Sequence, residues 1–153
     1  GKDTVINFML RRLKRSKLID DIIVAIPNDK KNIILEKYRN DKFNLIFQSD
    51  IVVIPSQNYE SFGYTAVEAM SLKKPLVTTD IGGLKEVILN NRNGYVVNYK
   101  NHKLFAKKIN YLLKNSSIRE RMGLYGYKRY LSLFTSKHMK KKYSQIMNTK
   151  KYE

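Results

Sequence analysis

Short apolar runs alternate with helix-patterned segments along most of this chain, and this alternation limits the possible folds more than any other feature. The strand-like runs, rich in Val, Ile and Thr, are residues 20–27, 51–55, 75–79 and 95–98. The segments with helical spacing of apolar residues are 4–18, 28–40, 63–72, 84–90 and 102–114, and two more helices follow. Strands that alternate with helices indicate βαβ units. We therefore predict an α/β fold, a Rossmann-like parallel sheet flanked by helices, with a helical C-terminus.

Three predicted loops connect the end of a strand to the start of a helix. They are PNDKK (27–31), SQNYESFG (56–63) and TTDIGG (78–83). Right-handed crossovers place such loops at the carboxyl edge of the sheet, where open α/β folds bind ligands. We therefore expect Glu60 to share one rim with Gly82 and Gly83.

The segment Ser61-Phe62-Gly63 stands at the predicted start of a helix, where backbone N–H groups lack intrahelical partners. The helix dipole adds partial positive charge there, which favours a phosphate or another anion. Gly63 would let a ligand approach the backbone closely. The alternative is an ordinary loop, in which Ser61 caps the helix and Gly63 serves the turn.

Two acids and two tyrosines surround this segment. Glu68, inside the helix, can accept two hydroxyl hydrogens of a ribose diol, and Glu60 can take hydroxyls of a sugar. Tyr59 and Tyr64 can stack on a base or sugar. Each residue also has an ordinary role, as a solvated acid or a packed ring. Two carboxyl-edge loops with such residues favour a nucleotide or sugar-phosphate ligand.

The composition narrows the classes of partner. The net charge is +17, which suits nucleic acid, an anionic membrane surface or acidic ligands. The basic residues are spread over several predicted helices and no nucleic-acid module is recognisable, so no nucleic-acid partner is predicted. Residues 133–153 are dense in Lys and predict a basic C-terminal helix, either on an anionic membrane or solvated.

The sequence contains no Cys and only two His, His102 and His138, which lie far apart. No disulfide, thiolate site or metal-ligand pattern is available, so neither a metal nor a cofactor is expected. No apolar run is long enough to span a bilayer and no signal peptide is recognisable. We expect a cytoplasmic protein, with possible peripheral binding at the inner face of the plasma membrane.

From Leu45 to Gly126 the chain resembles the donor-binding domain of the retaining GT-B glycosyltransferases of family 4. The resemblance centres on ESFGYTAVEAM (60–70), where two Glu are separated by seven residues. The residues that match the family pattern are Glu60, Phe62, Gly63, Glu68, Ala69, Met70, Pro75, Gly82, Gly83 and Glu86. Two departures stand out: Lys73 occupies a position where the family usually has Gly, and the first strand with its diphosphate-clamping basic pair is not recognisable.

This resemblance implies a retaining glycosyl transfer without a metal, in which the donor is a UDP- or GDP-sugar and the acceptor a polysaccharide or glycolipid. Glu60 would contact the transferred sugar as the catalytic residue, and Glu68 would bind the ribose. The implied donor-binding set is Ser61, Phe62, Gly63, Tyr64, Glu68, Gly82 and Gly83. The acceptor domain is missing, so the chain is expected to be inactive alone and to need that domain or a partner subunit. The alternatives are a non-catalytic nucleotide-sugar-binding or partner-supporting module, and a remnant fusion with a sugar nucleotidyltransferase.

Residues 1–37 resemble a segment of the cytidylyltransferase type of sugar nucleotidyltransferase, in the stretch from GKDTVINFMLRRLKRSKLIDDIIVAIP onward. At 153 residues the chain is still expected to form a single nucleotide-sugar-binding domain, in which residues 1–40 have a different origin. The first residue is Gly1 rather than Met, which suits a piece of a longer protein.

Overall fold

The computed structural model describes residues 42–149, and a boundary between two compact units falls between Gln48 and Ser49. The helix α2 (Lys42–Gln48), which buries Ile46, is the described part of the first unit. The sequence pattern predicted no element there. The elements predicted over residues 4–40, and the separate origin of residues 1–40, lie outside the described residues. The single domain over 1–153 stays a prediction.

The second unit is built on three parallel strands: β1 (Val52–Ile54), β2 (Leu76–Thr79) and β3 (Gly94–Val97). They lie in the order β1-β2-β3, with Val52 opposite Leu76 and Leu76 opposite Gly94. Every residue of β2 is buried, as expected for a central strand covered on both faces. The predicted parallel sheet is confirmed.

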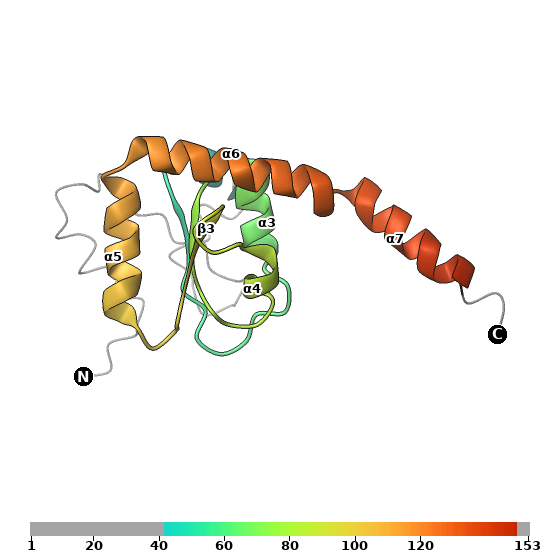
Figure 1. Cartoon of the computed structure of the whole chain (residues 1–153), viewed down its shortest axis with the longest axis horizontal. Helices are drawn as coiled ribbons and strands as arrows, with labels where there is room; N and C mark the ends of the chain where they lie inside the picture. Colours follow the sequence, from blue (N-terminus) through green and yellow to red (C-terminus); the bar gives the residue numbers. More distant parts are fainter. Residues whose placement is uncertain (1–41, 150–153) are drawn as a thin grey trace. The chain divides into compact units, whose positions relative to one another are not determined.

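Helices cover both faces of this sheet. In Figure 1, α5 (His102–Leu113) lies on one face, and α3 (Tyr64–Ser71) and the short α4 (Leu84–Val87) lie on the other. The long helix α6 (Ser116–Leu133) packs against α3, α5 and β3. The last described helix is α7 (Ser136–Thr149). The predicted flanking helices and helical C-terminus are therefore confirmed, although α4 is shorter than the pattern suggested.

The core of this unit lies between the sheet and its helices. Its largest fully buried apolar side chains are Met70, Leu76, Val77, Leu84, Val87, Ile88 and Leu112. The buried Asn93 is satisfied within the core, because its side-chain oxygen accepts the N–H of Leu89 at 2.7 Å and its amide nitrogen lies 3.4 Å from the sulfur of Met70. The carboxyl edge of the sheet therefore rests on a packed base.

Lys73 shows why the related enzymes favour Gly at this position. It follows α3 with φ of 58°, in the left-handed region that glycine enters at little cost. An L side chain there is disfavoured by about 1 kcal/mol or more. The sequence departure therefore falls on a helix end, where the backbone conformation is kept despite the side chain.

Candidate functional site

The loop between β1 and α3 carries Glu60 and folds its carboxylate back over the start of α3. One carboxylate oxygen accepts the N–H of Gly63 at 3.1 Å, and the other lies 3.5 Å from the hydroxyl of Ser56. Glu60 is half-buried. Without a ligand, this acid thus occupies the first free donor of the helix that follows it.

The loop between β2 and α4 lies directly against the Glu60 loop. The N–H of Gly83 donates to the backbone carbonyl of Glu60 at 3.1 Å. Gly82 has φ of 54°, and a Cβ at this position would overlap the same carbonyl oxygen. Only glycine fits such a position, so the expected common rim of Glu60, Gly82 and Gly83 is present in the fold.

A side chain of the sheet also ties the two loops together. The hydroxyl of Thr79, the last residue of β2, donates to the carbonyl of Ser56 at 2.8 Å, although the two residues are 23 positions apart. The Glu60 loop is therefore fixed at its start by β2 and near its middle by Gly83.

The start of α3 is uncapped by any side chain. The cap residue is Gly63, with φ of 85°, and Ser61 is exposed and does not cap the helix, contrary to the ordinary-loop alternative. Within residues 42–149, no acceptor is assigned to the N–H groups of Tyr64 and Thr65. These donors and the helix dipole make this end of α3 attractive to an anion.

The remaining predicted side chains stand around this helix start. Tyr64, in the first turn, is 73% exposed, and the ring of Phe62 meets its ring edge-on at 5.1 Å. Glu68 lies one helical turn after Tyr64 and is half-buried. The structure thus brings the Glu60 loop, the start of α3 and the Gly82-Gly83 turn together, while the individual roles stay predictions.

Three further residues at this rim were not predicted from the sequence. Asp80 accepts the Asn98 amide and the Tyr99 N–H, both at 2.9 Å, and so joins the loops that follow β2 and β3. Arg129 and Phe134, at the end of α6, contact α4 and Phe62. Asp80 stands in the predicted TTDIGG loop, so its position was a usable signal, whereas no local pattern distinguishes the other two.

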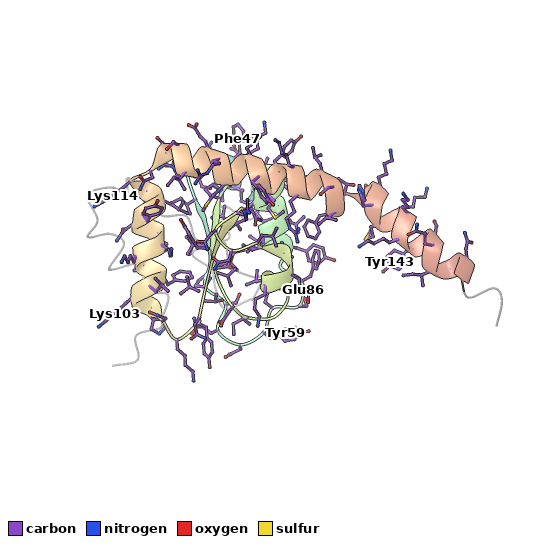
Figure 2. The ribbon with its side chains drawn as sticks, in the orientation of Figure 1. Phe47, Tyr59, Glu86, Lys103, Lys114 and Tyr143 are labelled. Carbon is purple, nitrogen blue, oxygen red and sulfur yellow. The ribbon has the colours of Figure 1, made fainter. Side chains whose placement is uncertain are left out.

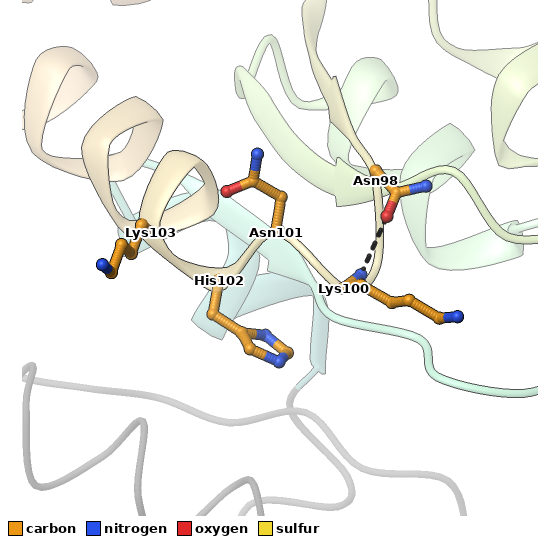
Figure 3. Close-up of a pocket in the computed structure, with 5 residues that line it drawn as sticks. All are labelled: Asn98, Lys100, Asn101, His102 and Lys103. Carbon is orange, nitrogen blue, oxygen red and sulfur yellow. Dashed lines mark hydrogen bonds between the residues drawn. The ribbon is translucent and has the colours of Figure 1, made fainter.

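An open hollow of about 520 Å³ lies at the loop before α5, lined by Asn98, Lys100, Asn101, His102 and Lys103. Figure 3 shows Lys100 and Lys103 extending in opposite directions, so their charges do not converge on one anion. The Asn101 side chain caps α5 by accepting the N–H of Leu104 at 3.0 Å. The hollow is therefore a solvated helix start at the same edge of the sheet rather than the predicted site.

Figure 2 places the labelled residues of this unit relative to the sheet. Tyr59, Glu86 and Lys103 lie toward one edge, and Lys114, at the far end of α5, lies toward the opposite edge. The edge with Tyr59 is the carboxyl edge, because the loop after β1 contains this residue. Within residues 42–149 no three His, Asp or Glu side chains cluster as metal ligands, and no helix is long and apolar enough to cross a bilayer.

The sequence matches the protein family described as "Glycosyl transferases group 1" over residues 14–129. This range includes part of the segment 1–37 that resembles sugar nucleotidyltransferases. CapM, a capsular polysaccharide biosynthesis glycosyltransferase of Staphylococcus aureus, is 28% identical over 137 residues, which cover 90% of this chain and 36% of CapM. A D-inositol 3-phosphate glycosyltransferase of Xylanimonas cellulosilytica is 36% identical over 123 residues, or 80% of this chain and 27% of that protein.

Solved structures agree with these relatives. TarM of Staphylococcus aureus, in complex with UDP, fondaparinux and alpha-GlcNAc-glycerol, superposes with a TM-score of 0.67 and 26% identity. The superposition covers 77% of this chain and 25% of the TarM chain. The chain thus spans between 25% and 36% of the length of the three proteins named.

Proposed function

The chain belongs to the group 1 glycosyltransferases, and from this premise we propose that it is the donor-binding half of such an enzyme. The reaction would transfer a sugar from a nucleotide-sugar to a polysaccharide or glycolipid acceptor, with retention of configuration. The observation that carries the proposal is the hydrogen bond from the Gly83 N–H to the Glu60 carbonyl. It joins the acid before α3 and the two glycines before α4 into one rim.

The proposed donor lies with its diphosphate at the start of α3. The N–H groups of Tyr64 and Thr65, together with the helix dipole, supply donors and partial positive charge there. The Gly63 N–H becomes a third donor when the Glu60 carboxylate turns from it toward the sugar hydroxyls. Glu68, one turn further along the helix, accepts the two ribose hydroxyls.

The chemistry that this arrangement supports is stabilisation of a leaving diphosphate. The bond between the sugar C1 and the diphosphate oxygen breaks, and its electron pair leaves with the diphosphate. The acceptor hydroxyl bonds to C1 on the same face, and its proton passes to a diphosphate oxygen. The residues of this chain bind and orient the donor, and the N–H groups at α3 stabilise the charge that develops. No metal or cofactor has a part in this proposal.

Titration with UDP, GDP and their sugars tests the donor site. We expect UDP or GDP to bind at micromolar to millimolar concentration, and Glu68→Ala to weaken binding about tenfold, because a charged acceptor of two hydrogen bonds is lost. Glu120→Ala, which removes an exposed acid of α6, is the matched control and should leave binding unchanged. Absence of nucleoside diphosphate binding at millimolar concentration would overturn the proposal.

The competing proposal is a module that binds nucleotide-sugar without turnover, or that supports a partner subunit. The share of its relatives that the chain spans, at most 36% for CapM and TarM, favours little or no transfer by the chain alone. Release of UDP from a UDP-sugar, measured with and without added polysaccharide acceptor, separates the two. Acceptor-dependent release by this chain alone would show that the catalytic unit is complete.

We also propose that α7 lies on an anionic membrane surface. It carries Lys137, Lys140, Lys141 and Lys142 and no acidic residue. Met139, Tyr143 and Met147, spaced by four residues and therefore on one face, are 60%, 65% and 69% exposed. Exposed apolar side chains beside lysines suit an interfacial helix on anionic lipid, where each lysine near the surface contributes about 1 kcal/mol.

Vesicle sedimentation tests this surface. The protein should pellet with phosphatidylserine-containing vesicles at low salt, remain in solution with pure phosphatidylcholine, and dissociate at high salt. Lys140→Glu with Lys141→Glu should reduce binding at least tenfold, whereas Lys107→Glu with Lys114→Glu, on α5, should reduce it less. Equal losses from both pairs would assign the binding to net charge rather than to α7.

A further inference from the structure

Two side chains at the end of α6, Arg129 and Phe134, reach the rim formed by Glu60 and Gly83. They lie far from the candidate donor residues in sequence, since Arg129 is 42 and 43 residues from the two carbonyls that it binds. Neither lies where the proposed donor would contact it. Both contact residues that do.

Arg129 holds the end of α4. Its Nε donates to the carbonyl of Val87 at 3.1 Å, and its Nη2 donates to the carbonyl of Glu86 at 2.7 Å. Carbonyls at a helix end lack intrahelical partners, so a guanidinium satisfies two of them at once. The other end of α4 begins at Gly83, whose N–H holds the backbone of Glu60 at 3.1 Å. Fixing α4 at its end therefore fixes the contact at its start.

Phe134 holds the aromatic pair at the start of α3. Its ring lies 6.0 Å from the ring of Phe62 at an interplanar angle of 70°, an edge-on contact. Phe62 in turn meets Tyr64 edge-on at 5.1 Å. The guanidinium of Arg129 lies over the opposite ring of this series, 5.5 Å from the centroid of Phe134. A continuous row of Arg129, Phe134, Phe62 and Tyr64 thus links α4 to the first turn of α3.

We propose that Arg129 and Phe134 are positioning residues for the donor site. The inference rests on the proposed function, because it concerns the same rim. Arg129 sets the position of α4 and with it the backbone of Glu60. Phe134 restrains Phe62, and through it the orientation of Gly63 and Tyr64, whose N–H groups are the proposed diphosphate donors. An affinity for the donor diphosphate that depends on the end of α6 is the consequence.

The experiment measures UDP affinity and backbone amide exchange on the same variants of the full chain. Phe134→Ala should weaken UDP binding about fivefold, the size expected for loss of an aromatic edge contact, and should speed amide exchange over residues 62–65. Phe134→Leu, which keeps bulk without a ring, should behave like Phe134→Ala, and Phe134→Tyr should restore both readouts. Leu133→Ala, at the neighbouring 40% exposed residue, is the matched control and should change neither.

A double substitution separates positioning from simple packing. If Phe134 acts through Phe62, Phe62→Ala and Phe134→Ala together should weaken UDP binding no more than the stronger single substitution. A purely structural role would lower the unfolding temperature while the folded protein kept its affinity and exchange pattern, and this result would overturn the inference. Wild-type protein that binds no UDP would refute the proposed function instead, and the exchange rates would then still decide whether Phe134 restrains the loop.

Discussion

Helices α6 and α7 are consecutive, basic and similar in length, yet they contribute to the fold in opposite ways. Helix α6 buries Met122, Gly123 and Gly126, and it carries the two side chains that reach the candidate site. None of the described side chains of α7, residues 136–148, is buried. Figure 1 shows α6 running along α3 and the end of α5, with α7 continuing beyond it.

The pattern of apolar residues does not explain this difference. Helix α7 has the clearer apolar stripe, with Met139, Tyr143 and Met147 on one face, and this stripe is exposed. The buried face of α6 depends on glycines, because a Cβ at Gly123 would overlap the carbonyl oxygen of Lys73, and one at Gly126 would lie 3.3 Å from Met70. Close approach of the backbone, rather than amphipathic spacing, therefore decides which helix packs.

The largest expected effect comes from Gly123→Ala. Helix propensity alone predicts that this change stabilises the protein by about 1 kcal/mol. The contact with Lys73 predicts instead a loss of about 2 kcal/mol from overpacking. Urea unfolding of this variant and of Ser144→Ala in α7, which should change stability by less than about 0.5 kcal/mol, decides between the two signs. Stabilisation by Gly123→Ala would remove the close approach as the basis of the difference between the helices.

Arg129→Ala is expected to have the next largest effect, a loss of about 1.5 kcal/mol of unfolding free energy. The loss arises because two carbonyls of α4 exchange a charged donor for water. Lys141→Ala removes the same charge from α7 and should cost less than about 0.5 kcal/mol. Equal losses in the two variants, measured by thermal or urea unfolding, would mean that net charge and not the α4 contact matters.

Thr135→Ala should act on α7 with little effect on the rest of the unit. The Thr135 hydroxyl accepts the N–H of His138 at 3.4 Å, in the geometry of a helix cap. Its removal should cost about 1 kcal/mol of local helix stability. Amide exchange should therefore rise in α7 and stay unchanged in α6, with Ser136→Ala as the control. Faster exchange in both helices would show that they unfold as one.

The smallest effect is expected from Met139→Ser combined with Tyr143→Ser. Both side chains are more than half exposed, at 60% and 65%, so the unfolding free energy should change by less than about 0.5 kcal/mol. The same variant should lose binding to anionic vesicles, which tests whether the exposed stripe has a surface to cover. A marked loss of stability would indicate that α7 packs as α6 does.

Most of the described fold could be predicted from local patterns. The β-branched runs at 51–55, 75–79 and 95–98 became β1, β2 and β3 with ends shifted by one or two residues. Helix α2 was missed, because KFNLIFQ (42–48) is short and has no cap signal. The extent of α4 was overestimated, since Ile88 turns extended, with φ of −105° and ψ of 119°, after only four helical residues.

The candidate site was predicted in part. Glu60, Gly82 and Gly83 were expected at one rim because carboxyl-edge loops of a parallel sheet converge, and the Gly83 N–H bond to Glu60 confirms this proximity. The Glu60 bond to Gly63 was not foreseen, since Ser61 was the expected cap in the ordinary-loop alternative. Phe134 had no local signal, because its contact with Phe62 joins distant parts of the chain.

The sequence by itself determined the alternation of strands and helices, and with it the edge where Glu60, Gly63 and the paired glycines meet. Those features follow from side-chain period and backbone preference, which act over a few residues. Only the tertiary structure decided that α6 packs while α7 stays exposed, and that Arg129 and Phe134 support the rim. Such choices depend on how closely distant backbones approach, as at Gly123 and Lys73, and no local pattern carries that distance.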